Sequence, residues 1–457
     1  MKNLLGCLTW ISGVMGALFC AVWLWDRWCV FPGNYWNDLR LAPTIAFFRG
    51  FSVYSSGDGI ANTWLYGPLP IMLMWPVACA KTAVGVLEIG ATLTIGLPTI
   101  IVAAVCWSWP SRNSPVGKFT AAVVCVLLSV SAYFCADIPA IGFGLLGNLF
   151  LIHRKMWPAA ICAVSAVACK QLAVSLLLAQ LVWLIVTNRN EVKNQLIRYC
   201  VVALGLGGFA VWIFGAKNLW HTMVELPGGL PWTDEPLKHL SQSSNYLLLY
   251  TFVPVVAMLT WRSFFWRPDS PLLLPSISFF TALPLGVIAL FKTGGGTNSI
   301  HSFALWMPAL VPVVLHSKRP RVLLGCSLLV AGFAFWRLND HPLTMIPELQ
   351  AYNEAAYLAS RAPDRCWFPT NPLVTLCAQN RYYHDEDGLY ERKVAGYPLT
   401  EAQIKAGLPV DQRVTVFPHI WVDYSFWGIA EERLPKGAVI YPFGRWWVVG
   451  DLPRLLH

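Results

Sequence analysis

The stretch that decides the fold is residues 25–87, WDRWCVFPGNYWNDLRLAPTIAFFRGFSVYSSGDGIANTWLYGPLPIMLMWPVACAKTAVGVL. It lies between two long hydrophobic segments and carries acids, amides and glycines that the hydrocarbon core of a bilayer does not accommodate. Its apolar part, residues 68–80, is only about 13 residues long and is interrupted by prolines, so it is too short to cross. We therefore interpret residues 25–87 as a long external loop that forms part of an active site.

The composition around this loop is that of a membrane protein. Of 457 residues, 56% are hydrophobic and 12% are charged, about half the charged fraction of an ordinary soluble domain. The apolar residues form runs of about 17–23 residues, the length at which an α-helix crosses a bilayer. The net charge of +9 comes from short basic clusters between these runs, which indicate topology and not a nucleic-acid partner.

These runs predict an all-α polytopic membrane protein with about eleven spans. The first, residues 4–24, is too long for the apolar part of a signal peptide and lacks a small-residue cleavage site, so we expect an uncleaved helix. The other expected spans are residues 88–108, 119–136, 138–152, 157–171, 172–187, 199–215, 245–261, 271–291, 302–316 and 322–337. Gly205, Gly207 and Gly208 could break one of them.

The loops between the spans set the orientation. With the N-terminus in the cytoplasm, every short cytoplasmic loop is basic, as the positive-inside rule requires. The residues concerned are Lys2, Arg112, Lys118, Arg154, Lys155, Arg189, Lys193, Arg198, Arg262, Arg267, Lys318, Arg319 and Arg321. An odd number of spans then places the tail outside the cytoplasm, which predicts a multi-pass membrane protein with its N-terminus in the cytoplasm.

The sequence divides into a transmembrane domain, residues 1–337, and a polar tail, residues 338–457. The tail holds short runs typical of strands, RVTVF, AVIYPF and RWWVVG, and is expected to be a small extracytoplasmic α/β or mostly β domain. Cys366 and Cys377 lie in this tail, and a disulfide between them is left open. Residues 381–393, RYYHDEDGLYERK, are rich in His, Asp and Glu, but their spacing favours a solvated loop over a metal site.

Two acids are the candidate catalytic residues. Asp38 begins a segment, residues 36–48, whose apolar residues recur at helical spacing and predict a helix lying along the membrane interface. Asp137 stands at a turn between two spans, where an acid points to function. For each, an N-cap is the structural alternative.

Further polar clusters are expected on the same external side. Lys170 and Gln171 end one hairpin, and a cation there suits an anionic phosphate leaving group, although Lys170 could also extend to water without a role. In LFKTGGGTNSIHSF, residues 290–303, the glycine N–H groups could cradle an oxyanion, or form only a flexible turn. The side-chain donors of this cluster are Lys292, Asn298 and His301.

These motifs resemble the GT-C class of membrane glycosyltransferases, in bacterial members that use a polyprenyl-phosphate sugar. The residues that carry the resemblance are Asp38 followed by FFRGFSVY (47–54), YGPLP (66–70), ADIP (136–139), ACKQ (168–171) and KTGGGTNS (292–299). The sequence departs from the pattern at Gly67, where relatives have proline, and by lacking an arginine at the start of the next span. Arg40, Arg49 and Lys81 are the candidate replacements for that phosphate contact.

The resemblance implies a multi-pass enzyme of the cell inner (plasma) membrane with a GT-C-like core. This enzyme would move a sugar from a polyprenyl-phosphate carrier to a glycan, lipid or protein acceptor on the external face. The resemblance assigns Asp38 as the general base of an inverting single displacement and Asp137 as a second acid, and it leaves open a divalent metal ion held by both. Lys170, Gln171, Lys292, Asn298, His301, Arg40 and Tyr66 would bind substrate or phosphate. The alternatives are an O-antigen-type polymerase or ligase, and a lipid or solute transporter or flippase.

Overall fold

The structure is a computed structural model of the whole chain. It describes residues 35–57, 59–109, 136–234, 266–295, 345–418 and 440–450, together with single residues between 14 and 31 and residues 236 and 299. Four predicted spans, residues 119–136, 245–261, 302–316 and 322–337, fall almost wholly outside these ranges, as does most of the first.

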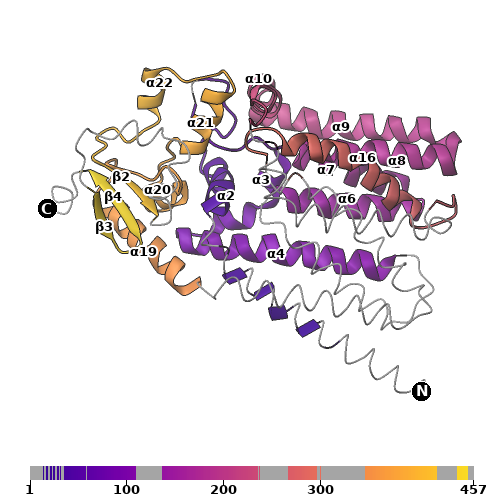
Figure 1. Cartoon of the computed structure of the whole chain (residues 1–457), viewed down its shortest axis with the longest axis horizontal. Helices are drawn as coiled ribbons and strands as arrows, with labels where there is room; N and C mark the ends of the chain where they lie inside the picture. The colour runs from indigo at the N-terminus through magenta and orange to yellow at the C-terminus, as the bar shows by residue number, and fades with distance from the viewer. Residues whose placement is uncertain are drawn as a thin grey trace. The chain divides into compact units, whose positions relative to one another are not determined.

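The chain forms two compact units, each built from separated segments. The helical unit comprises residues 1–28, 94–209 and 232–342, and the mixed unit comprises residues 29–93, 210–231 and 343–457. Figure 1 labels the helices and strands of both.

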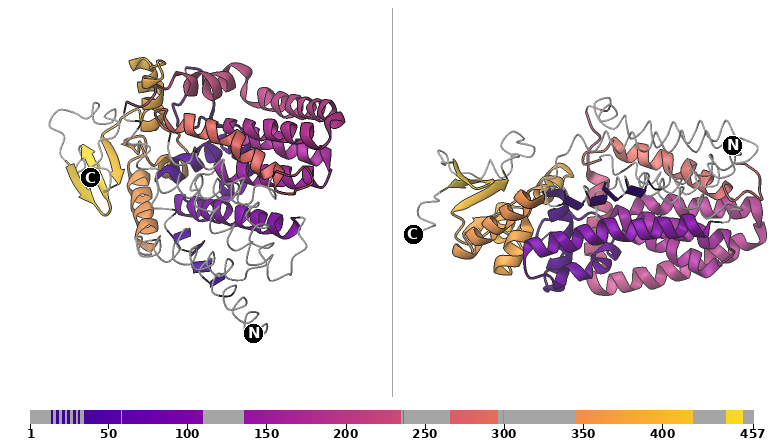
Figure 2. Two further views of the ribbon diagram at one scale, coloured as in Figure 1. Left: turned by 45° about the vertical axis from the view of Figure 1, so that its right-hand side comes forward. Right: turned by 90° about the horizontal axis from the view of Figure 1, so that it is seen from below.

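Apolar helices make up the described part of the helical unit, and each coincides with a predicted span. Two of them, α4 and α9, continue into the mixed unit along the chain. The helices α6 to α9 run alongside one another (Figure 1 and Figure 2). The helices are α4 (Ala83–Ser108), α6 (Asp137–Ile152), α7 (Met156–Cys169), α8 (Val174–Thr187), α9 (Val192–Phe214) and α16 (Leu273–Leu290).

Three stretches are long and apolar enough to cross a bilayer, judged by length and composition among the described residues: Ala83–Ser108, Arg189–Phe214 and Leu273–Leu290. The second contains Gly205, Gly207 and Gly208, the glycines that could have broken a span. Helix α9 runs unbroken through all three. Neighbouring good helix formers and a complete ladder of backbone hydrogen bonds tolerate single glycines at a modest cost.

A chain of buried amides and hydroxyls links four helices of this unit. The Tyr199 hydroxyl donates to Gln180 Oε1 at 2.6 Å, and Gln180 Nε2 donates to Asn148 Oδ1 at 3.2 Å. The Asn148 amide then donates to Ser278 Oγ at 3.0 Å. Because unsatisfied polar groups are costly among apolar helices, this chain specifies how α9, α8, α6 and α16 pack.

The mixed unit is organised around α2 (Tyr35–Phe48), the helix predicted from residues 36–48. Residues 37–46 are buried on every side, and Leu41, Ala42 and Ile45 have no exposed area. The expectation of a helix with one face on the membrane surface is therefore wrong. Helix α2 packs on the 3₁₀ turn η1 (Trp75–Cys79) and on α20 (Pro372–Gln379) of the tail, which cover its polar side as well.

Residues 68–80 do not form a span, as predicted. They form only α3 (Leu69–Leu73) and η1, two five-residue helices interrupted by prolines. After α9 the chain continues through α10 (Ala216–Trp220), the π-helical turn η4 (His221–Glu225) and α11 (Leu226–Gly229).

The described part of the tail contains a four-stranded sheet in the order β1-β2-β4-β3. Its strands are β1 (Cys366–Trp367), β2 (Val414–Pro418), β3 (Ile440–Phe443) and β4 (Trp446–Gly450), and the last three coincide with the predicted strand segments. Strands β1 and β2 are parallel and the other pairs are antiparallel. The tail helices are α19 (Met345–Arg361), α20, α21 (Glu386–Val394) and α22 (Glu401–Ala406). Cys366 and Cys377 are both free thiols.

Candidate active site

The carboxylate of Asp38 is fully enclosed within the mixed unit. Asp38 is the fourth residue of α2 and has no exposed area. Its Oδ2 accepts a hydrogen bond from the Tyr352 hydroxyl at 2.8 Å, and its Oδ1 accepts one from the backbone N–H of Leu373 at 3.0 Å. The Asn371 amide donates to the Tyr352 hydroxyl at 2.8 Å and lies 3.5 Å from Asp38 Oδ2.

This geometry corrects the N-cap alternative for Asp38. The residue does not cap its own helix, because it lies inside α2. It instead caps α20, since Leu373 is the second residue of that helix and its N–H lacks an intrahelical acceptor. Asp38 therefore joins the segment of residues 25–87 to the tail.

Burial sets the protonation of Asp38. Removal from water raises the pKa of this carboxyl to about 7, while the hydrogen bonds from Leu373, Tyr352 and Asn371 oppose the shift. A pKa near neutrality lets one carboxyl both accept and release a proton under physiological conditions.

Side chains of the tail also form hydrogen bonds with the backbone of the loop that follows α2. Asp385 Oδ2 accepts from Thr63 N at 3.1 Å, and His384 Nδ1 accepts from Ala61 N at 2.7 Å. Arg392 donates to the Ser55 carbonyl at 2.7 Å. The prediction of a solvated loop at residues 381–393 is therefore wrong, since residues 382–389 are buried and this segment binds the loop that follows α2.

A group of buried acids surrounds Arg40. Its guanidinium donates to the Thr63 carbonyl and lies 4.6 Å from the centre of the Tyr66 ring. Burial raises the pKa of Asp385 to about 7 and that of Glu391 well above its usual range, and the charge of Arg40 opposes both shifts. Arg40 and Tyr66 are thus brought together as candidates, but the positive charge of Arg40 faces acids as well as any phosphate.

In the helical unit the structure pairs two other candidates, Asp137 and Lys170. Asp137 is the first residue of α6 and not its N-cap, and the Lys170 ammonium forms an ion pair with its Oδ1. The two side chains are 1% and 12% exposed, so the pair is shielded from bulk water. Gln171 follows Lys170 directly and begins the short 3₁₀ turn η2 (Gln171–Ala173).

Lys292 lies in the turn after α16. Its ammonium is 5.5 Å from the centre of the Trp232 ring. The backbone N–H of Gly295 donates to the Lys292 carbonyl at 2.7 Å, so the turn itself uses this N–H, which was a candidate for an oxyanion cradle. Asn298 and His301 lie outside the described residues.

The donor set does not fit a metal ion at Asp38. Both carboxylate oxygens accept hydrogen bonds from N–H and O–H groups, which are the partners of an anion and not ligands of a cation. Within the ranges that the structure describes, no three His, Cys, Asp or Glu side chains gather as a metal site. In this arrangement Asp38 binds hydrogen-bond donors and not a metal ion.

Several residues of this site were not predicted from the sequence. Tyr352, Asn371 and Leu373 hold Asp38, and Asp385 and Glu391 lie near Arg40. The density of acids in HDED, residues 384–387, was the only sequence signal, and it does not reveal burial by a segment more than 300 residues away.

The fold has counterparts among solved structures. The chain is similar to the crystal structure of ArnT from Cupriavidus metallidurans in the apo state, with a TM-score of 0.59 and 13% identity over 96% of this chain and 98% of that one. It is also similar to the structure of the same protein bound to undecaprenyl phosphate, with a TM-score of 0.57, the same identity and the same coverage.

No family model and no curated protein matches the sequence. At 13% identity the likeness establishes the fold alone. ArnT is a polyprenyl-phosphate-dependent membrane glycosyltransferase of the GT-C class, and the fold of this chain is the ArnT fold.

Proposed function

We propose that this protein is a membrane glycosyltransferase that moves a sugar from a polyprenyl-phosphate carrier to an acceptor hydroxyl on the external face of the membrane. The observation that carries the proposal is the ArnT fold over 96% of the chain. One of the ArnT structures holds undecaprenyl phosphate, which is the carrier lipid without its sugar.

In the proposed reaction Asp38 is the general base. Its carboxylate takes the proton of the acceptor hydroxyl while the acceptor oxygen attacks the anomeric carbon. The bond between that carbon and the phosphate oxygen breaks, and polyprenyl phosphate leaves with the electron pair. A single displacement of this kind inverts the configuration at the anomeric carbon.

Support for this role comes from the pKa of Asp38, which burial raises to about 7, the range in which a general base works best at neutral pH. Tyr352 and Leu373 each donate to one carboxylate oxygen, and each oxygen accepts up to two hydrogen bonds, so the acceptor hydroxyl binds a remaining lone pair of this enclosed carboxylate or displaces one of the two donors. The Tyr352 hydroxyl is the more easily displaced partner, because a side chain rotates more freely than the backbone of a helix.

The remaining candidates are assigned to the carrier phosphate. A cation beside a leaving phosphate stabilises the charge that develops as its bond breaks. Lys170 suits this task with Asp137 holding its ammonium in place. The residues proposed to share it are Gln171, Lys292, Arg40 and Tyr66, and from the sequence alone Asn298 and His301.

The proposal is tested by sugar transfer itself. Purified protein in lipid nanodiscs is given a radiolabelled undecaprenyl-phosphate sugar and a membrane extract as acceptor, and Asp38→Asn is compared with the native chain. We expect transfer to fall by about 10²–10⁴-fold, the usual contribution of a general base. The matched control is Asp411→Asn, which removes a half-exposed carboxylate that pairs with Arg413 on the surface.

Full transfer by correctly folded Asp38→Asn would exclude Asp38 as the base and leave the enzyme assignment standing. Lipid movement across the membrane by native protein, without sugar transfer to any acceptor, would exclude the enzyme assignment and favour a flippase.

A further inference from the structure

A histidine and a glutamate on the π-helical turn η4 form a pair that the proposed reaction does not use. The Nδ1 atom of His221 lies 2.7 Å from Glu225 Oε2. His221 is 6% exposed, whereas Glu225 is partly exposed. The ring of His221 also packs edge-on against the Tyr397 ring, with the ring centres 5.0 Å apart, so both its angle and its position are fixed.

The pairing determines what the other ring nitrogen can do. An ionised carboxylate only accepts hydrogen bonds, so the Nδ1 atom of His221 carries the proton that Glu225 binds. In the neutral ring the Nε2 atom then presents a lone pair. This Nε2 atom is buried and has no hydrogen-bond partner among the residues that the structure describes.

A second polar atom on the same turn is also buried without a hydrogen-bond partner in the part of the chain that the structure describes. The hydroxyl of Thr222 is buried and lacks a partner within the described ranges. Buried polar atoms without partners are rare in native folds, and π-helical turns occur frequently at functional sites. Two such atoms on consecutive residues of a π-helical turn indicate a place where a ligand completes the hydrogen bonding.

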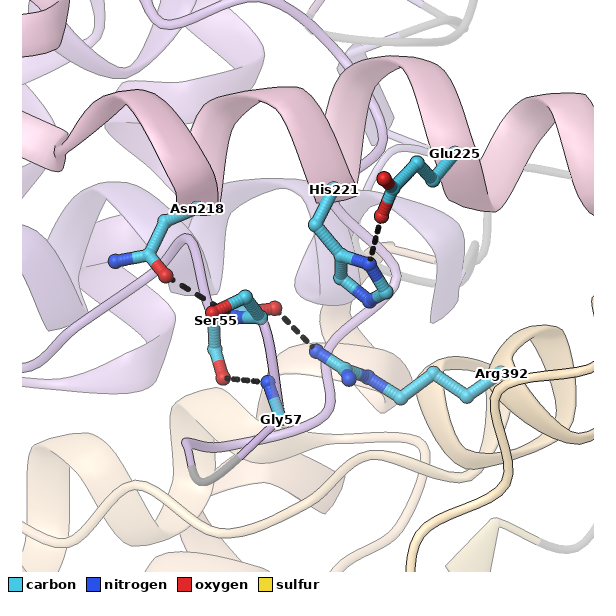
Figure 3. Close-up of polar contacts among 7 residues, drawn as sticks. Ser55, Gly57, Asn218, His221, Glu225 and Arg392 are labelled. Atoms are coloured by element: carbon cyan, nitrogen blue, oxygen red, sulfur yellow. Dashed lines mark hydrogen bonds and ion pairs between the residues drawn. The ribbon is translucent and has the colours of Figure 1, made fainter.

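The surroundings narrow the class of ligand. Figure 3 shows the His221 ring pointing from the helix towards the loop at Ser55 and Gly57, with the Arg392 guanidinium reaching the same loop. Asn218, on the same helical segment, accepts a hydrogen bond from the N–H of Ser56 at 3.2 Å. A lone pair needs a hydrogen-bond donor, and a hydroxyl is the neutral donor that a ligand of the proposed reaction supplies.

We propose that the His221–Glu225 pair is a carbohydrate-binding subsite in which His221 Nε2 accepts a hydrogen bond from a sugar hydroxyl. The choice of a sugar among hydroxyl-bearing molecules rests on the proposed function. Glu225 is a positioning residue that fixes the tautomer, and Tyr397 holds the ring in place. The hydroxyl belongs either to the sugar on the lipid carrier or to a sugar of the acceptor.

The experiment measures binding and needs no turnover. Dissociation constants for a panel of methyl hexopyranosides and pentopyranosides, and for undecaprenyl phosphate with and without its sugar, are measured on native full-length protein and on His221→Asn. Asparagine keeps an N–H for Glu225 but has no atom at the Nε2 position. We expect at least tenfold weaker binding of the glycosides, of the lipid-linked sugar, or of both, and an unchanged constant for undecaprenyl phosphate.

The two arms identify the source of the hydroxyl. Weakening confined to the lipid-linked sugar assigns the subsite to the donor, and weakening confined to the free glycosides assigns it to the acceptor. The matched control, His153→Asn, changes an exposed histidine at the end of α6 and leaves all constants unchanged.

A ligand-side measurement avoids the question of whether the variant folds. Monodeoxy analogues of the tightest glycoside are bound to native protein, and one of them should lose at least tenfold in affinity. That loss should become smaller in Glu225→Gln, because the glutamine amide can turn either its oxygen or its N–H group towards Nδ1 and so no longer favours one tautomer.

Unchanged binding of both the glycosides and the lipid-linked sugar in His221→Asn, or binding of neither by native protein, overturns the inference, and Nε2 then meets only water. A transfer assay on the same samples separates this result from the proposed function. If native protein transfers sugar but His221→Asn leaves sugar binding unchanged, only the proposed subsite is excluded. If sugar binding depends on His221 but native protein transfers no sugar, only the proposed enzyme activity is excluded.

Discussion

The carboxylate of Asp38 accepts a hydrogen bond from the backbone N–H of Leu373, 335 residues later in the chain, at 3.0 Å. Through this bond a residue of helix α2 caps helix α20 of the tail. The candidate base is therefore both a chemical group and a structural connection, and its two roles can be separated experimentally.

The pH dependence of transfer tests the chemical role. Because the pKa of Asp38 is raised to about 7, we expect the rate to rise about tenfold per pH unit below that value and to level off above it. Initial rates between pH 5 and 9 check this. A flat profile over the same range contradicts a base with this pKa.

Tyr352→Phe tests the hydrogen bonds that hold Asp38. The change removes a donor to a fully buried carboxylate and an acceptor for Asn371, which should cost about 1–3 kcal/mol of unfolding free energy. The pH midpoint of transfer should also move upward, since this hydrogen bond lowers the pKa of Asp38. Tyr357→Phe, at an exposed position of α19, should change neither quantity.

The stability of the protein should fall as the pH rises from about 4 to about 7. The pKa of Asp385 is about 7 in the folded state against an ordinary 3.8, so in this window the folded state binds more protons than the unfolded state. Thermal unfolding at pH 5 and pH 7 measures the effect. Asp385→Asn should weaken this pH dependence, and Asp411→Asn should leave it intact.

Gly388→Ala tests the contact between α21 and the first loop. A Cβ atom at position 388 would lie 2.5 Å from the backbone nitrogen of Asn62, which cannot move aside as a flexible side chain would. We expect the free energy of unfolding to fall by at least about 1–3 kcal/mol, the usual cost of overpacking a core. Gly228→Ala has open space around it, and an unchanged thermal midpoint there serves as the comparison.

Gln180→Leu tests the buried polar chain of the helical unit. Leucine leaves the Tyr199 hydroxyl and Asn148 Oδ1 without their partner, at a cost of about 1–3 kcal/mol. Unfolding in detergent measures it, with the exposed Gln350→Leu as the matched change. Equal stability of the two variants would show that the chain of amides does not hold the helices together.

The sequence by itself determined the local structure. Long apolar runs predicted the helices α4, α6 to α9 and α16, because the length of a hydrophobic segment reflects the thickness of the bilayer. Short runs typical of strands in the polar tail predicted β2, β3 and β4. Asp38, Asp137 and Lys170 stood out because charged residues are uncommon beside such segments.

The tertiary structure alone decided which of these groups meet. Tyr352 and Leu373 surround Asp38 from more than 300 positions away, residues 382–389 are buried although their composition is that of a solvated loop, and Asp137 pairs with Lys170. The physical reason is the separation in sequence over which each interaction acts. Helical and strand periodicity depend on neighbouring residues, whereas burial and hydrogen-bond partners depend on which distant segments pack together, and these in turn set the pKa of Asp38.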